Sequence, residues 1–144
     1  MEISACVKYV GVNDHQVDLF EGQYKVPNGM SYNSYVILDE KIAVMDTVDG
    51  FFTEEWLNNV EQVLSGKTPD YLVIQHMEPD HSASIPAFLK KYPNATVVST
   101  AKGFQFMEQF FPEFFAGQGL PAEQRIVAAN DGVLELGQHS LHFI

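Results

Sequence analysis

The sequence predicts a mixed α/β domain in which packed sheets are covered by helices. Short strand-like runs fill the first part of the chain, helices and strands alternate in the middle, and strands return at the end. The chain has 144 residues, the size of one domain. Hydrophobic residues make up 46% and charged residues 19%, which is typical of a globular protein.

The first part of the chain predicts short strands. Residues 3–12 and 16–20 are β-rich and are separated by an Asn-Asp pair, which is typical of a turn. Residues 32–38 are rich in Tyr, Val and Ile and predict another strand. Residues 41–46 form a nearly continuous apolar run, which predicts a strand covered on both faces.

The rest of the chain alternates helix and strand patterns before it returns to strands. Apolar residues recur every three or four positions in residues 52–64, which predicts a helix, and Gly66 is suited to end it. Asp131 and Gly132 predict a hairpin-type turn. The remaining predicted helices are residues 82–91 and 102–111, and the remaining predicted strands are residues 70–75, 95–99, 125–128 and 133–144.

The last residues, 141–144, lie inside an apolar run that predicts a strand. Domains rarely finish inside such a strand, because its pairing partners must come from elsewhere. We therefore expect residues 1–144 to be the N-terminal portion of a larger domain.

The charge of the chain bears on its partners. The formal net charge is −11, and an acidic surface repels phosphate backbones and anionic lipid headgroups. No segment approaches the roughly 20 apolar residues of a membrane-spanning helix, and no long apolar stretch predicts a signal peptide. We expect a cytoplasmic protein that binds neither nucleic acid nor membranes.

Four side chains able to bind a metal, His76, Glu78, Asp80 and His81, fall within six residues. They directly follow a predicted strand, a place where α/β proteins commonly build sites. Pro79 favours an extended or turned backbone, in which side chains two residues apart face the same way. We therefore expect three of the four to converge, with His81 pointing elsewhere or swung round by the turn.

A polar surface loop is the alternative interpretation of this stretch. Two imidazoles and two carboxylates at this spacing favour a metal site instead. Ser82 is suited to cap the following helix, whose positive end would lie beside the carboxylates. The donors suit iron or zinc, so their chemistry alone does not identify the metal.

The sequence of residues 75–86, QHMEPDHSASIP, resembles the His-x-Glu-x-Asp-His signature of flavodiiron proteins. Hydrolases of the metallo-β-lactamase fold usually carry His-x-His-x-Asp-His, so Glu78 is the discriminating residue. Residues 29–37 and 45–49 resemble two further segments of the family. The resemblance covers nearly the whole chain and implies the first part of a metallo-β-lactamase-like αββα layered sandwich.

The resemblance also implies roles for individual residues. His76 and Glu78 would bind one iron and Asp80 the other, while His81 binds the second iron in some members and is displaced by water in others. Asp46 would orient a ligand, or it simply ends its strand. The remaining ligands, a His, a bridging Asp and a final His, would lie beyond residue 144, as would a flavodoxin-like domain carrying FMN.

The implied function is reduction of O2 to water, or of NO to nitrous oxide, at a non-haem pair of iron ions. Electrons would come from FMN and from rubredoxin or a similar donor, within a head-to-tail homodimer or a tetramer. Residues 1–144 alone are expected to be inactive. Two alternatives stay open, a zinc-dependent hydrolase of the same fold and a non-catalytic half-domain that assembles with another chain.

Overall fold

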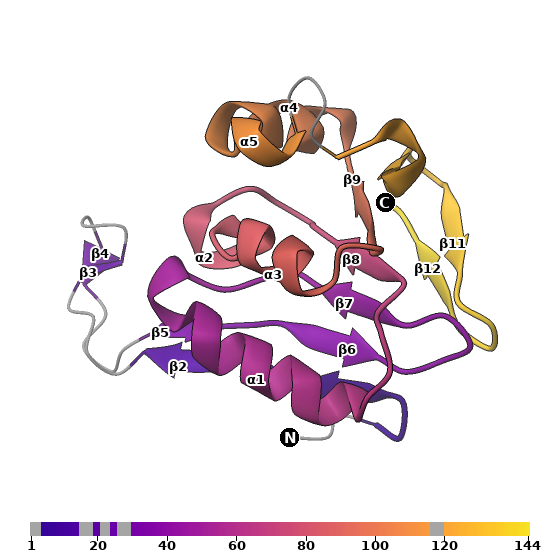
Figure 1. Cartoon of the computed structure of the whole chain (residues 1–144), viewed down its shortest axis with the longest axis horizontal. Helices are drawn as coiled ribbons and strands as arrows, with labels where there is room; N and C mark the ends of the chain where they lie inside the picture. Colours follow the sequence, from indigo (N-terminus) through magenta and orange to yellow (C-terminus); the bar gives the residue numbers. More distant parts are fainter. Residues whose placement is uncertain (1–3, 15–18, 21–23, 26–29, 116–119) are drawn as a thin grey trace.

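A computed structural model describes residues 4–14, 19–20, 24–25, 30–115 and 120–144. Six strands form the main sheet in the order β1-β6-β7-β8-β9-β10 (Figure 1). β1, β6 and β7 pair antiparallel, whereas β7 to β10 run parallel. The strands are β1 (Val7–Tyr9), β6 (Tyr35–Ile37), β7 (Ala43–Met45), β8 (Tyr71–Val73), β9 (Thr96–Ser99) and β10 (Arg125–Val127).

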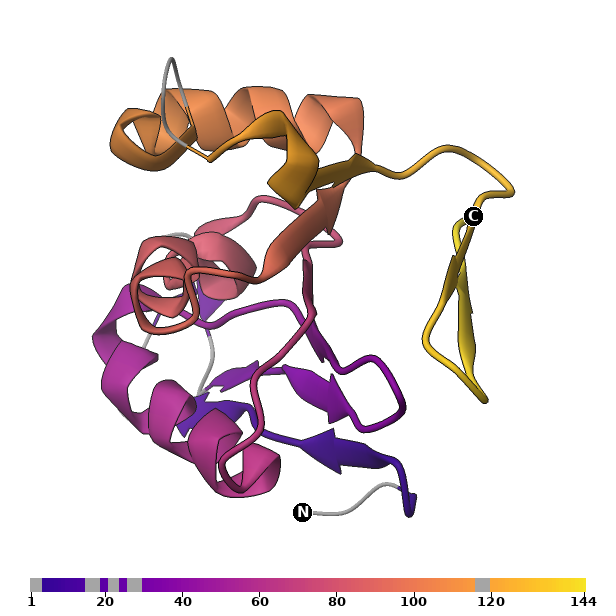
Figure 2. The ribbon, with the colours of Figure 1, turned by 45° about the vertical axis from the view of Figure 1, so that its right-hand side comes forward.

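Helices cover one face of this sheet, and a strand pair lies across the other face (Figures 1 and 2). The helices are η1 (Gly50–Phe52), α1 (Thr53–Leu64), α2 (Pro79–Ser82), α3 (Ile85–Lys91), α4 (Ala101–Phe110), α5 (Pro112–Phe115) and η2 (Ala122–Gln124). The strand pair on the other face consists of β11 (Val133–Glu135) and β12 (Ser140–His142). Two smaller pairs join β2 (Val12–Asp14) to β5 (Met30–Tyr32), and β3 (Leu19–Phe20) to β4 (Tyr24–Lys25).

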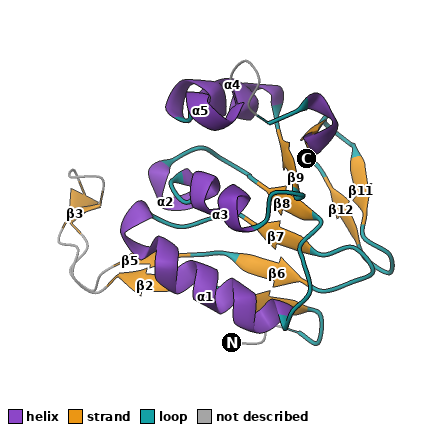
Figure 3. Cartoon of the chain, viewed as in Figure 1, coloured by secondary structure: helices purple, strands orange, loops and turns teal. Residues whose placement is uncertain are grey.

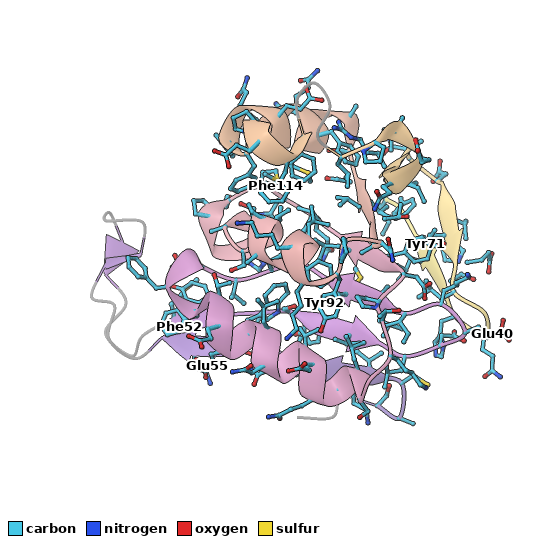
Figure 4. All side chains as sticks on the ribbon, in the orientation of Figure 1. Glu40, Phe52, Glu55, Tyr71, Tyr92 and Phe114 are labelled. Atoms are coloured by element: carbon cyan, nitrogen blue, oxygen red, sulfur yellow. The ribbon has the colours of Figure 1, made fainter. Side chains whose placement is uncertain are left out.

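Successive side chains of the strands point to opposite faces of the sheet, so the buried residues form two clusters, one on each face. Val44, Leu72 and Val97 are paired across three strands and pack against the helices. Neighbouring residues such as Val73 and Val98 face the opposite way and pack against Leu134 and Leu136, as period-two alternation requires. Side chains fill the space between helices and sheet, among them Tyr92 and Phe114 (Figure 4).

The predicted fold class, mixed α/β, is confirmed. Figure 3 colours the helices and strands, and Figure 2 shows them in separate layers. The predicted helix at residues 52–64 matches α1, whose Trp56, Val60 and Leu64 are buried. It is followed by Ser65 and Gly66, both with positive φ. No helix among the described residues is long and apolar enough to cross a bilayer.

One predicted turn is wrong in position, and a second is present but does not connect a hairpin. Asn13 and Asp14 lie in β2 and pair with Ser31 and Met30 of β5. Close approach of the two segments is possible at Gly11, where a Cβ atom would clash with the carbonyl of Tyr32. Residues 16–18 of the strand predicted at 16–20 lie outside the described residues. The turn at Asp131 joins β10 to β11, which do not pair with each other. The hairpin bends instead at residues 136–139, where Gly137 has φ 127°.

The helix predicted at residues 82–91 is divided in two. α2 ends at Ser82, and α3 begins at Ile85, with Pro86 in its first turn. Pro86 has no amide hydrogen to donate to residue 82, and its ring would clash with that carbonyl in a continuous helix. The division matters because α2 carries part of the candidate site.

Candidate metal site

The candidate site begins where the buried strand β8 ends. Irregular backbone follows from residue 75, and α2 starts at Pro79. Glu78 directly before the proline is extended, with φ −65° and ψ 145°, as the residue before a proline prefers. Pro79 fits the first helical position, because an amide hydrogen there would have no partner within the helix.

The extended geometry predicted through Asp80 is wrong beyond Glu78, because Asp80 and His81 belong to α2. The helical turn brings His81 back toward His76, and the centroids of their rings lie 4.3 Å apart. Of the two expected positions for His81, the structure therefore shows the one in which the turn swings it round. The helix at Asp80 was not predicted, although a proline is common at the first position of a helix.

The carboxylates of the motif belong to Glu78 and Asp80. Glu78 is exposed, and the side chain of Asp80 lies outside the described part of the structure. Among the described residues, no three His, Cys, Asp or Glu side chains form a group able to hold a metal ion. Convergence of His76, Glu78 and Asp80 on a metal therefore stays a prediction.

Asp46 lies at the end of β7 and is 5% exposed. Its backbone is left-handed, with φ 59°, a conformation that Asp tolerates better than most residues. One carboxylate oxygen accepts a hydrogen bond from the backbone amide of Gln75 at 2.8 Å, and the other from the side-chain amide of Gln75 at 3.0 Å. The second oxygen lies 3.7 Å from Nδ1 of His81. Asp46 thus ends its strand and faces one of the predicted metal ligands, His81.

Opposing influences act on the charge of Asp46. Burial raises the pKa of its carboxyl above the ordinary value, while the hydrogen bonds from Gln75 and the nearby imidazoles of His81 and His76 act in the opposite direction. The effect of burial is the largest, so the pKa of the Asp46 carboxyl lies above its ordinary value. A cation bound by the histidines would favour the ionised carboxylate.

Hydrogen bonds hold the backbone of α2 against β7. The amide and the hydroxyl of Thr47 both donate to the carbonyl of His81, each at 2.9 Å. The hydroxyl of Ser82 donates to the carbonyls of Met77 and Glu78, each at 3.0 Å. The prediction that Ser82 caps the following helix is therefore wrong, because α2 starts before it and Ser82 closes the preceding loop instead.

The residues present fit part of a metal site. Two imidazoles lie in contact, and a carboxylate faces Nδ1 of one of them, the arrangement that commonly orients a metal-binding histidine. Nitrogen and oxygen donors of this kind suit iron and zinc. Sequence reasoning missed Gln75 and Thr47, although both stand directly beside predicted site residues at the ends of apolar strands.

The sequence of this chain is similar to a known protein family and to several characterised proteins. The family described as "ODP family beta lactamase" matches residues 30–144. The anaerobic nitric oxide reductase flavorubredoxin of Vibrio vulnificus is 38% identical over 95 residues, covering 65% of this chain and 19% of that protein. The chain thus spans about a fifth to a quarter of the length of such curated relatives.

Two solved structures show the same fold. The flavodiiron protein from Giardia intestinalis has a TM-score of 0.85 and 30% identity, covering 98% of this chain and 32% of that one. Rubredoxin oxygen:oxidoreductase from Desulfovibrio gigas has a TM-score of 0.87 and 30% identity, covering 97% of this chain and 33% of that one. Because the family match extends over most of the chain, this protein belongs to the ODP beta lactamase family, and its resemblance to flavodiiron proteins is confirmed.

Proposed function

We propose that residues 1–144 form the N-terminal portion of a metallo-β-lactamase-like diiron domain, in an oxidoreductase that reduces O2 to water, NO to nitrous oxide, or both. The observation that carries the proposal is the carboxylate residue Glu78 between His76 and the pair formed by Asp80 and His81. Relatives named as a nitric oxide reductase and as an oxygen oxidoreductase support the reaction class.

In this proposal His76 and Glu78 hold one iron, and Asp80 and His81 hold the other. The contact between the two imidazole rings supports a shared site. Asp46 faces Nδ1 of His81 and orients its ring, while Thr47 fixes the backbone of the same residue. The iron ions, when bound, would supply electrons and Lewis acidity to the substrate.

Further donors and cofactors belong to the same proposal. In this proposal the remaining ligands, a His, a bridging Asp and a final His, come from outside residues 1–144. FMN would supply electrons, and rubredoxin or a similar donor would reduce it. We expect a cytoplasmic protein that assembles as a head-to-tail homodimer or a tetramer.

Metal identity and activity test this function in the full-length protein that contains this chain. After anaerobic purification we expect bound iron, consumption of O2 or NO with a reduced donor, and no hydrolase activity. Glu78→His should shift the metal content from iron toward zinc, because imidazole replaces a carboxylate that favours harder ions. Glu55→His in the exposed first turn of α1 is the matched control and should leave the metal content unchanged.

Bound zinc with hydrolase activity in the unmodified protein would contradict the proposal and favour the metallo-β-lactamase-type hydrolase. Absence of any bound metal would favour a half-domain that serves only for assembly.

A further inference from the structure

Gln75 holds both carboxylate oxygens of Asp46. Its backbone amide donates to Oδ1 at 2.8 Å, and its side-chain amide donates to Oδ2 at 3.0 Å. The backbone of Asp46 is held as well, because its amide donates to the carbonyl of Val73 and its own carbonyl accepts from the hydroxyl of Ser34. These contacts leave the carboxylate little freedom to rotate.

The oxygen that accepts the Gln75 side chain is also the one that faces His81. Oδ2 of Asp46 lies 3.7 Å from Nδ1 of His81. The carbonyl of His81 is held by Thr47, and its ring lies against the ring of His76. At this distance the two groups interact electrostatically without a direct hydrogen bond, so the position of Oδ2, which the Gln75 amide sets, acts on the His81 ring.

Gln75 lies outside the buried core. Gln75 is exposed, and it lines an open cavity of about 290 Å³ between the ends of β8 and β9 and the end of β12. Its backbone hydrogen bond to Asp46 persists whatever side chain is present. A substitution at this position thus removes one hydrogen bond and leaves the core intact.

We propose that Gln75 is a positioning residue, whose side-chain amide orients the His81 imidazole for metal binding by fixing Oδ2 of Asp46. The inference rests on the proposed function only in taking His81 as a metal ligand. Residues that orient metal ligands typically change affinity by about 10- to 100-fold when they are replaced. A similar loss is expected at Gln75.

Titration of the full-length apoprotein with Co²⁺ alone tests the inference through affinity and the visible absorption of the bound ion. Gln75→Met keeps the length of the side chain without its donor, and Gln75→Glu places a second carboxylate beside Asp46. Both should weaken Co²⁺ binding by about tenfold or more and alter its spectrum, while the far-UV circular dichroism of the apoprotein stays that of the folded wild type. Gln62→Met, at an exposed position of α1, should change neither.

The mediating role of Asp46 is tested with a double variant. In an Asp46→Asn background, Gln75→Met should cause no further loss, because the two residues act in one chain of contacts. Independent, additive losses would overturn the inference, as would loss of the native fold in the Gln75 variants. Wild-type affinity in the Gln75 variants, with weakened binding in His81→Ala, would overturn this inference alone. Unchanged binding in His81→Ala would contradict the proposed function instead.

Discussion

Ser34 joins the buried core to the candidate metal site. It is fully buried, and its hydroxyl donates to the carbonyl of Asp46 and accepts from the indole nitrogen of Trp56, each at 2.9 Å. Trp56 is itself fully buried in α1. One hydroxyl therefore satisfies a buried donor in the helical layer and steadies the left-handed residue that faces His81.

Replacing Ser34 with alanine should destabilise the fold. The buried indole N–H of Trp56 would lose its acceptor, and a buried polar group without a partner costs about 1–3 kcal/mol. The free energy of unfolding, measured with denaturant, checks this. Ser31→Ala, which removes an exposed hydrogen bond to Asn13, should change it by less than about 0.5 kcal/mol. Equal effects of the two variants would show that burial of the hydroxyl is not what matters.

At the scale of elements, the β11–β12 hairpin is held to the main sheet by Asp39, which follows β6. Its carboxylate accepts hydrogen bonds from the backbone amides of Gln138 and His139, and contacts Nδ1 of His139 at 2.7 Å. Burial of the carboxyl acts to raise its pKa, but hydrogen bonds from Gln138, Glu40 and His139 outweigh it and hold the pKa of Asp39 well below its ordinary value of 3.8. The ionised carboxylate thus favours the docked hairpin.

This contact predicts a pH dependence of hairpin docking. The pKa of Asp39 is lower in the folded state than in the unfolded state. Its contribution to the stability of the docked hairpin is therefore fully present above the unfolded-state pKa, and is lost as the pH falls from about 4 toward the folded-state pKa. Amide exchange in β11 and β12 should therefore accelerate, relative to the main sheet, below about pH 4.

Asp39→Asn should show weaker protection of these amides at neutral pH and no such transition. Glu40→Gln, at an exposed position, is the control and should behave as the wild type. Protection that changes neither with pH nor in Asp39→Asn would mean that other contacts hold the hairpin, namely the apolar packing of Leu134 and Leu136 and the hydrogen bond from the Lys41 amide to the Leu136 carbonyl.

For the whole molecule, the features predicted correctly were those set by local periodicity. The apolar stripe of α1 and the continuous apolar run that includes β7 identify their own elements, because burial on one or both faces leaves a repeating pattern. The turn at Asn13 was misplaced because pairing of β2 with β5 depends on a strand that lies far along the chain. The division between α2 and α3 is also a local feature, because Pro86 lies in the first turn of α3 and a proline disfavours a helix that continues through it.

In the candidate site, the motif could be predicted from the sequence, but the contacts between residues distant in the chain could not. The types and spacing of His76, Glu78, Asp80 and His81 indicate metal chemistry without a structure. Gln75 and Asp46, which are hydrogen-bonded, lie 29 positions apart in the sequence. The pairing of β7 with β8 brings them together. Periodicity carries no information about such contacts.

The central claim is that the loop from His76 to His81 binds iron, and iron content tests it most directly. The full-length protein, purified anaerobically, should contain an iron pair per chain, and Glu78→Ala and Asp80→Ala should each lose a large part of it, while Glu55→Ala at an exposed position of α1 retains it all. Iron content that is unaffected by both site variants, or absent from the unmodified protein, would contradict the account.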